Sequence, residues 1–291
     1  MPATALAGLR NYIELMKPRV LVLVVFSALP VLGMASSGWP SPAAAFFILL
    51  GIALAGGAAN CLNCYLERER DALMERTRNR PLPAARLAPG HALVFGLALT
   101  VVSTLLLYAV GGATAAGLGV ATILFYVFVY TVWLKPRSTW NAVIGGVAGA
   151  GAPLIADAAV NGTLTWAGIL LFAIVFFWQP PHVWAIALFR KTDYERAGIP
   201  MLPNVIGEEP TRWRMLWYTL GLLPVTVAPY SLGLLGWFYL MCAVVLGAWF
   251  TFHVVRLVRE RTAAAARRAF FVSMTYLGLL LLTMLLDLAL R

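Results

Sequence analysis

Long apolar segments follow one another along this chain from residue 19 to residue 289. A helix that crosses the hydrocarbon core of a bilayer needs about 20 mainly apolar residues. The segments of that length cover residues 19–38, 42–65, 90–111, 113–134, 141–160, 165–188, 213–231, 233–255 and 269–289. Transmembrane barrels instead show short strands of alternating hydropathy. The pattern predicts an all-α polytopic membrane protein, a bundle of nine transmembrane helices in a single domain over residues 1–291.

Composition supports the same class. Hydrophobic residues make up 61% of the chain and charged residues 12%, far from a soluble globular composition. The net charge of +10 suggests nucleic acid as a partner in a soluble protein. In a membrane protein the positive-inside rule explains such an excess. We therefore expect no nucleic-acid partner.

Positive charge is strongly one-sided in this topology. The N-terminal segment, the loops after the second, fourth, sixth and eighth spans and the span ends that adjoin them hold 21 of the 22 Lys and Arg residues, and only Arg291 lies on the other side. The positive-inside rule then puts the N-terminus and the polar loops 66–89 and 189–212 in the cytoplasm, and the C-terminus outside.

A row of polar residues closes the second apolar segment. Asn60, Asn63, Glu67 and Asp71 are spaced 3, 4 and 4 residues apart, which places them within roughly an 80° arc of one helical face. Amides and carboxylates are costly at the end of a buried helix and indicate a functional role. Three arginines follow closely: Arg76, Arg78 and Arg80.

Two further clusters of candidate site residues, at the ends of the fourth and sixth segments, fall on the same side of the membrane. Lys135 and Arg137 end the fourth segment; they suit either a snorkelling, aromatic-belt role or a part in a site. Trp178, Gln179 and His182 flank paired prolines, which predict a kink in the sixth segment.

The loop after the sixth segment carries Lys191, Asp193, Tyr194 and Arg196. These side chains either face the first polar row across a cavity or form a solvated charged loop.

Carboxylates and arginines at the mouth of a helical bundle suit one kind of chemistry. Mg²⁺ binds a few carboxylates together with phosphate oxygens, and nearby Arg and Lys neutralise the remaining phosphate charge. An apolar interior accommodates a hydrocarbon tail and excludes water. Such a site could ionise an allylic diphosphate, with metal and cations stabilising the leaving group and aromatic faces stabilising the allylic cation.

The first polar row, with the Met74-Glu-Arg76-Thr77 run behind it, resembles the first Asp-rich motif of the UbiA-type intramembrane prenyltransferases. Further blocks, spread over about residues 10–285, are similar to the branch of that family whose acceptor is heme. They are Glu14-Leu-x-Lys17-Pro18-Arg19, Tyr130-Thr131-x-Trp133-Leu-Lys135, Trp178-Gln179-Pro-Pro-His182-x-Trp184, Asp193-Tyr194-x-x-Ala197-Gly198-Ile-Pro200-Met201-Leu-Pro203 and Ser273-x-x-Tyr276-Leu.

The resemblance implies a Mg²⁺-dependent transfer of a farnesyl group from farnesyl diphosphate to the 2-vinyl group of protoheme IX (heme b), with addition of water, giving heme O. It implies a multi-pass protein of the cell inner membrane in contact with lipid, with heme A synthase as the acceptor of the product.

The resemblance also assigns roles to residues. The catalytic residues it implies are Asn63, Glu67, Asp71, Lys191, Asp193 and Tyr194. The substrate-binding residues are Asn60, Arg76, Arg80, Lys135, Arg137, Trp178, Gln179 and His182, the last near heme as an iron ligand or a propionate contact. The metal ligands are Asn63, Glu67, Asp71 and Asp193.

The chain departs from the wider family pattern at two points. Glu67 stands where the general pattern has Asp, and Ala197 stands where the second motif has its second Asp. These changes argue against a symmetrical two-metal site.

Two alternatives to heme prenylation are open. One is a UbiA-type enzyme with a quinone precursor or a chlorin as acceptor. The other is a transporter, which would place polar residues along several helices or break helices in two matching halves.

Overall fold

The long apolar segments form the long helices of the protein. The computed structural model describes residues 2–35 and 38–291, and these residues contain helices and no strand. The elements are α1 (Pro2–Leu15), α2 (Pro18–Gly33), α3 (Pro42–Leu73), α4 (Pro89–Leu124), the π-helix η1 (Phe125–Leu134), α5 (Asn141–Ile144), α6 (Gly146–Gly149), α7 (Gly151–Asn161), α8 (Trp166–Phe189), α9 (Lys191–Arg196), α10 (Leu202–Val205), α11 (Glu208–Ser231), α12 (Trp237–Glu260) and α13 (Ala263–Ala289). The predicted all-α fold is confirmed.

The predicted number of nine spans stays a prediction. Six helices of the described chain qualify by length and composition, or seven if the bent pair formed by residues 8–15 and α2, with a 50° angle between its parts, is one span. Helix α11 does not qualify, since Glu208, Glu209 and Arg212 open it and polar residues are interspersed along the rest of it. Residues 36 and 37, at the end of the first predicted segment, lie outside the described residues.

Helix α4 continues into η1, and the two together count as one apolar stretch although the chain reverses within them. Gly112 has φ 73° and ψ −173°, a conformation that only glycine adopts readily. Leu107 packs against Gly119, so the parts before and after Gly112 lie side by side. The break falls where the sequence predicts a turn, between residues 111 and 113.

The fifth predicted segment, 141–160, is divided into the short helices α5, α6 and α7. Glycines 145, 146, 149 and 151 fall at these breaks, and glycine disfavours a continuous helix. Helix α8 remains helical through Pro180 and Pro181.

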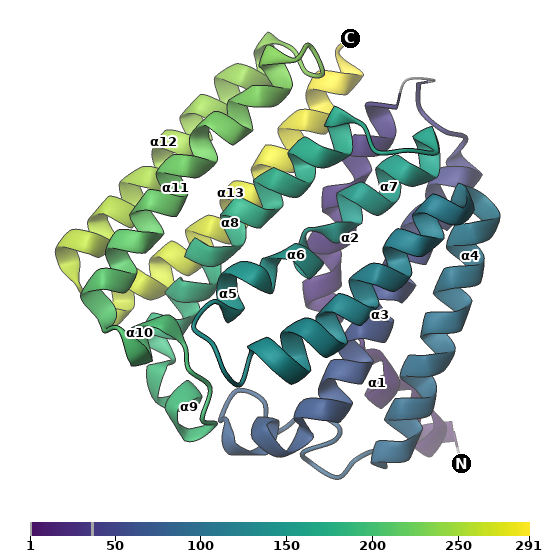
Figure 1. Ribbon diagram of the computed structural model, residues 1–291, viewed down its shortest axis with the longest axis vertical. Helices are drawn as coiled ribbons and strands as arrows, with labels where there is room; N and C mark the ends of the chain where they lie inside the picture. The colour runs from purple at the N-terminus through teal and green to yellow at the C-terminus, as the bar shows by residue number, and fades with distance from the viewer. Residues whose placement is uncertain (1, 36–37) are drawn as a thin grey trace.

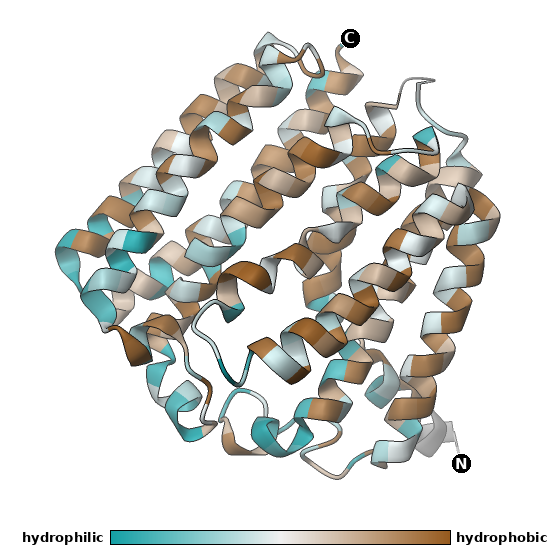
Figure 2. Ribbon diagram, viewed as in Figure 1, coloured by the Kyte–Doolittle hydropathy of each residue, from teal (hydrophilic) through white to brown (hydrophobic). Residues whose placement is uncertain are grey.

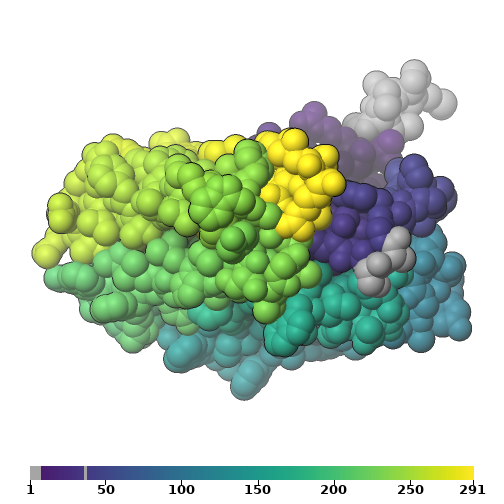
Figure 3. All heavy atoms as spheres, turned by 90° about the horizontal axis from the view of Figure 1, so that it is seen from above, coloured from purple at the N-terminus to yellow at the C-terminus, as the bar shows by residue number. Residues whose placement is uncertain are grey.

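The helices stand side by side with their ends at two opposite faces (Figure 1). Helix α3 packs along α4, while α8 packs against α11 and α13, and α2 contacts α3, α7, α8 and α13. Seen from above, α11–α13 lie at one end of the molecule and α3 and α4 at the other (Figure 3). The N-terminus, α9 and the loop after α3 share one face, and the C-terminus lies at the other (Figure 1).

Polar residues gather at the face that carries α9 and the loop after α3, whereas the helices between the faces are mainly apolar (Figure 2). This distribution agrees with a multi-pass membrane protein. Exposed large apolar side chains are frequent on α4 and α12, as lipid contact requires. Whether residues 1–291 form one domain stays a prediction.

Two buried aspartates lie near the face that carries the C-terminus, and each accepts hydrogen bonds from residues at the start of a helix. The Asp157 carboxylate accepts hydrogen bonds from the backbone N–H and the hydroxyl of Thr165, directly before α8. The Asp287 carboxylate accepts hydrogen bonds from the backbone N–H groups of Gly236 (2.6 Å) and Tyr239 (3.0 Å) at the start of α12. Backbone N–H groups at a helix start lack partners within the helix, so both aspartates act as caps supplied by another part of the chain.

Asp287→Asn is expected to lower the free energy of unfolding by about 1–2 kcal/mol, because an amide has one acceptor oxygen and no charge to offer the start of α12. Thermal unfolding in detergent would measure the loss. Glu69→Gln, which alters an exposed side chain of α3, serves as the control. An Asp287→Asn protein that melts at the wild-type temperature would contradict the capping role.

Candidate active site

The polar row predicted from the sequence lies on one buried face of α3. Asn60, Asn63, Glu67 and Asp71 have relative exposures of 7%, 1%, 4% and 4%. Helix α3 runs to Leu73, beyond the predicted end of its segment at residue 65, so the whole row is helical. Four polar groups that are buried together require partners within the protein.

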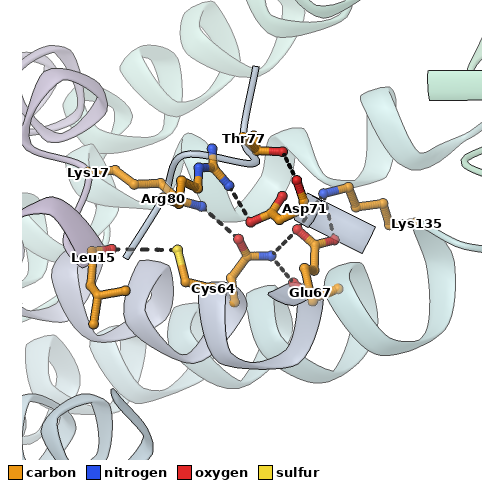
Figure 4. A network of polar contacts seen from close by, with 10 residues as sticks. Leu15, Lys17, Cys64, Glu67, Asp71, Thr77, Arg80 and Lys135 are labelled. Atoms are coloured by element: carbon orange, nitrogen blue, oxygen red, sulfur yellow. Dashed lines mark hydrogen bonds and ion pairs between the residues drawn. The ribbon is translucent and has the colours of Figure 1, made fainter. Parts of the chain in front are cut away.

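Lysines from two other segments enter this row. Lys17 Nζ donates to Asn63 Oδ1 over 2.7 Å. Asn63 Nδ2 in turn donates to Glu67 Oε2 (2.9 Å) and to Thr131 Oγ1 (3.0 Å). Lys135 Nζ lies 2.6 Å from both carboxylate oxygens of Glu67. Figure 4 shows Lys17 and Lys135 approaching the row from opposite sides.

The end of the row is closed by the loop that follows α3. Arg80 Nη1 donates to Asp71 Oδ2 over 2.7 Å, and the Thr77 hydroxyl donates to the Asp71 backbone carbonyl over 2.8 Å (Figure 4). Burial alone would lower the pKa of Arg80, but the Asp71 carboxylate outweighs it, so the pKa of the guanidinium lies above its ordinary value. The loop is therefore fastened to the polar row by a charged pair.

The π-helix η1 presents Thr131 and Lys135 to α3. The Thr131 hydroxyl donates to the carbonyl of Tyr126 over 2.8 Å, and the backbone N–H of Lys135 donates to the carbonyl of Tyr130 over 2.8 Å. Both acceptors lie five residues back in the chain. The Lys135 ammonium also lies 5.7 Å from the centre of the Tyr130 ring. Single π-helical turns often occur at functional sites.

Lys17 occupies the junction of α1 and α2. Its φ of 55° and ψ of 60° are left-handed, which is uncommon for a residue with a side chain. Asn60 Nδ2 donates to the carbonyl of the preceding Met16 over 3.0 Å and ties this junction to α3. Lys17 and Thr131 lie within the blocks of family resemblance, but the sequence predicts no role for either. The available signal was a lysine directly before a span, followed by Pro18.

The second polar loop meets the first through apolar contacts. Tyr194 packs with Met74 in a small buried cluster. Asp193 is 3% exposed, and its Oδ2 accepts no hydrogen bond within the described chain; Arg190 Nη1 lies 3.9 Å away. Lys191 forms an ion pair with Glu208 at 3.6 Å. The two loops are neighbours, and Asp193 has a buried oxygen available to a ligand.

Two of the predicted phosphate-binding arginines lie outside the buried network. Arg76 is exposed on the loop after α3. Arg137 is exposed as well and donates to the carbonyls of Val132 and Trp133 at the end of η1. Their assignment to substrate stays a prediction.

An apolar cavity of about 390 Å³ lies between α2, η1, α8 and α13. Trp178, Gln179 and His182 of α8 line it, together with Tyr126 and Tyr130. The Tyr130 ring thus borders the cavity and also faces the Lys135 ammonium. Tyr130 is therefore the residue through which the cavity neighbours the polar network.

The donor set suits a hard divalent cation. Asn63, Glu67 and Asp71 supply amide and carboxylate oxygens from one helix face, and Asp193 Oδ2 is buried and without a hydrogen bond. Within residues 2–35 and 38–291, no three His, Cys, Asp or Glu side chains lie close enough together to hold a metal ion alone. Mg²⁺ commonly binds one or two carboxylates and completes its shell with phosphate oxygens and water, which this arrangement fits.

Lys135→Met is expected to destabilise the protein by about 3–5 kcal/mol, because it leaves the Glu67 carboxylate buried without its cation. Adding Glu67→Gln to Lys135→Met should restore much of that loss, since the buried charge is then gone. Thermal unfolding of the two single variants and the double variant measures the coupling.

Glu69→Gln, which removes the exposed Arg68–Glu69 pair, should change stability by less than about 1 kcal/mol. Additive effects of Lys135→Met and Glu67→Gln would show that the buried pair is not coupled.

The sequence matches the UbiA prenyltransferase family over residues 24–277. It is 46% identical to the protoheme IX farnesyltransferase of Symbiobacterium thermophilum over 96% of this chain and 94% of that protein. It is 45% identical to protoheme IX farnesyltransferase 2 of Nitrobacter winogradskyi, over 98% of this chain and 93% of that protein.

Solved structures share the fold at low sequence identity. A digeranylgeranylglyceryl phosphate synthase superposes with a TM-score of 0.79 at 16% identity, covering 96% of this chain and 98% of that one. A UbiA homolog from Archaeoglobus fulgidus, bound to DMAPP and Mg²⁺, superposes with a TM-score of 0.66 at 14% identity, covering 94% of this chain and 99% of that one. With a family match over most of its length and relatives near half identity over nearly all of it, the chain belongs to the UbiA prenyltransferase family.

Proposed function

We propose that this protein transfers a farnesyl group from farnesyl diphosphate to the 2-vinyl group of heme b, with addition of water, to form heme O and diphosphate. The observation that carries the proposal is the 46% identity, over almost the whole of both chains, to a protoheme IX farnesyltransferase. The buried polar row beside an apolar cavity supplies a site with suitable chemistry for that reaction.

The first step is loss of diphosphate from the farnesyl group. The bond between the farnesyl C1 and the diphosphate oxygen breaks, and its electron pair leaves with the diphosphate. Lys17, Arg80 and Lys135 converge on the polar row and would bind the departing charge. Asn63, Glu67, Asp71 and Asp193 would hold Mg²⁺, which when bound neutralises negative charge on the phosphate oxygens.

The ion pairs of the structure hold these groups in place before substrate arrives. Glu67 and Asp71 are each paired with one cation, Lys135 and Arg80 respectively. When diphosphate and its metal bind, Lys135 and Arg80 can pair with the phosphate oxygens, and Glu67 and Asp71 can bind the metal ion. An exchange of partners therefore keeps every buried charge compensated, which a low-dielectric site requires.

The cavity then protects the allylic cation. The rings of Tyr126 and Tyr130 line it and present electron-rich faces to a positive charge. The vinyl π electrons of heme form the new carbon–carbon bond, and the positive charge moves to the vinyl carbon next to the macrocycle. A water molecule adds there and loses a proton, which completes the hydroxyethylfarnesyl chain.

Purified protein incubated with heme b, farnesyl diphosphate and Mg²⁺ should form heme O, identified by its mass. Chelation of the metal should stop the reaction, and added Mg²⁺ should restore it. Turnover of 4-hydroxybenzoate together with none of heme would contradict heme as the acceptor and indicate a quinone-precursor prenyltransferase.

Asp71→Asn is expected to reduce turnover by about 10²–10³-fold at saturating Mg²⁺, since it removes a charge that helps to hold metal and diphosphate. Glu69→Gln on the same helix serves as the matched control, because its side chain is exposed and lies off the polar row. Heme O formation and thermal unfolding would be measured for both. Turnover of Asp71→Asn near the wild-type level would exclude the metal role.

We also propose that the protein lies in the cell inner membrane with the polar loops in the cytoplasm and the C-terminus outside, and that it passes heme O to heme A synthase. The asymmetry of Lys and Arg supports this orientation. A cysteine placed at Glu75, in a chain whose native cysteines are replaced, should react with an impermeant maleimide only after cells are opened. A cysteine at Ser231 should react in cells whose inner membrane is intact. The reverse pattern would overturn the orientation.

A further inference from the structure

The turn between α12 and α13 concentrates positive charge at the end of two helices that are long and apolar enough to span a membrane. Residues 252–271 contain one acidic residue, Glu260, and five arginines: Arg256, Arg259, Arg261, Arg267 and Arg268. Figure 2 shows this turn as a hydrophilic end of the helix pair. The positive-inside rule accounts for basic residues in such a turn, but it does not specify how their side chains are arranged.

The same pairing of an arginine with an exposed ring occurs on both helices. On α12 the Arg256 guanidinium carbon lies 5.9 Å from the centre of the Phe252 ring, and on α13 that of Arg267 lies 5.9 Å from the Phe271 ring. The two rings are 56% and 54% exposed. Because the helices pack side by side and run in opposite directions, both arginines lie on the turn side of their rings. The rings therefore mark the border between the apolar surface and the basic turn.

Glu260 joins the two helices through their arginines. Its carboxylate accepts a 2.7 Å hydrogen bond from Arg256 Nε of its own helix and lies 3.6 Å from Arg268 Nη1 of α13. One carboxylate thus compensates two guanidinium groups in part. Arg259 and Arg267 are exposed, and no carboxylate of the described chain pairs with either of them. The turn therefore holds uncompensated cations beside exposed aromatic rings.

We infer that this cluster binds the phosphate headgroup of an anionic phospholipid across the ends of α12 and α13. The residues that form the site are Phe252, Arg256 and Arg259 of α12 and Arg267 and Phe271 of α13. Spacings of four and three residues put the α12 members on one helix face, and a spacing of four does the same on α13. Guanidinium groups bind phosphate oxygens in a planar, bidentate manner, and basic pockets between transmembrane helices bind anionic headgroups.

The exposed rings favour a lipid over a soluble anion. A free phosphate ion would need the guanidinium groups alone, whereas Phe252 and Phe271 lie where the apolar surface of the helices begins. There they would contact the acyl chains of a lipid whose phosphate is bound by the arginines above them. Aromatic side chains are frequent at this level of a membrane protein. An acidic protein surface would also pair with the arginines, but it gives the rings no apolar partner.

The site lies on the outer side of a helix turn whose inner side forms part of the cavity. Phe271 faces the surroundings of the protein, whereas the adjacent Phe270 lines the cavity and stacks on His182 with ring centres 4.6 Å apart. A lipid bound by Arg267 and Phe271 would therefore stabilise the turn of α13 that carries Phe270. Lipid binding at this place does not depend on which acceptor the cavity takes.

The test uses full-length protein in an uncharged detergent, without substrates, and adds either phosphatidylglycerol or zwitterionic phosphatidylcholine. Native mass spectrometry counts the lipids that the protein retains, and thermal unfolding measures their effect. Wild type should retain phosphatidylglycerol in preference to phosphatidylcholine, and phosphatidylglycerol should raise the unfolding temperature. Glycerol phosphate, a headgroup without acyl chains, should raise it far less. An equal rise with glycerol phosphate would indicate a site for soluble anions and would overturn the assignment to lipid.

Arg259→Gln combined with Arg267→Gln should weaken phosphatidylglycerol binding about 30-fold, because each arginine near an anionic headgroup contributes a factor of about five. Both arginines are exposed and lack carboxylate partners, so their replacement leaves no buried charge. Arg10→Gln combined with Arg78→Gln is the matched control. It removes the same charge from two exposed arginines elsewhere on the polar face and should leave binding unchanged.

Equal retention of the two lipids by wild type would overturn the inference and leave the arginines as a topology signal or as a surface for an acidic protein. Equal loss of phosphatidylglycerol binding in both double variants would also overturn it, since net charge rather than this site would then attract the lipid. If the double variant at residues 259 and 267 does not fold, each single replacement should weaken binding about fivefold. Unchanged binding in both single variants would exclude the site.

Discussion

Burying the two carboxylates of α3 is the constraint on which the rest of the site depends. Glu67 and Asp71 are each 4% exposed, and an isolated carboxylate in such surroundings is very costly. Each therefore requires a cation, and the cations come from elsewhere: Lys135 from the end of η1 and Arg80 from the loop after α3. Lys17, at the α1–α2 junction, joins the same network through Asn63. One electrostatic requirement thus draws four parts of the chain together.

The protein compensates its buried carboxylates in two different ways. Near the opposite face, Asp157 and Asp287 accept hydrogen bonds from backbone N–H groups at helix starts, and Asp287 also pairs with Arg291 at 3.2 Å. The backbone donors belong to the helices and cannot leave without unfolding them. On α3, the partners of Glu67 and Asp71 are the ends of long side chains alone, which can turn to another anion. This contrast separates carboxylates that maintain the fold from carboxylates that can exchange partners during a reaction.

Local features of the site could be predicted from the sequence, but its pairings could not. The 3, 4, 4 spacing placed Asn60, Asn63, Glu67 and Asp71 on one face because helix geometry is a local property. The break at Gly112 followed from the turn residues. By contrast, the partners of Glu67 and Asp71 depend on how η1 and the loop pack on α3, and neither arrangement has a local signal.

The same difference explains what sequence reasoning missed. Asp157 and Asp287 received no role because the helix starts that they cap lie 8 and about 50 residues away in the chain. The hydrogen bond between His182 and Ser273 joins residues 91 apart. The prediction of a continuous helix over residues 141–160 missed the breaks between α5, α6 and α7, which fall at glycines.

The π-helix from Phe125 to Leu134 limits how the chain can vary in length. In such a segment the backbone N–H of one residue donates to the carbonyl five residues back, as the backbone N–H of Lys135 does to the carbonyl of Tyr130. At constant winding, losing or gaining one residue there would turn the side chains beyond it by roughly 100° about the helix axis. Lys135 would then move away from the Glu67 carboxylate. Within this family, the segment is therefore a point where relatives should differ in residue type far more readily than in residue number.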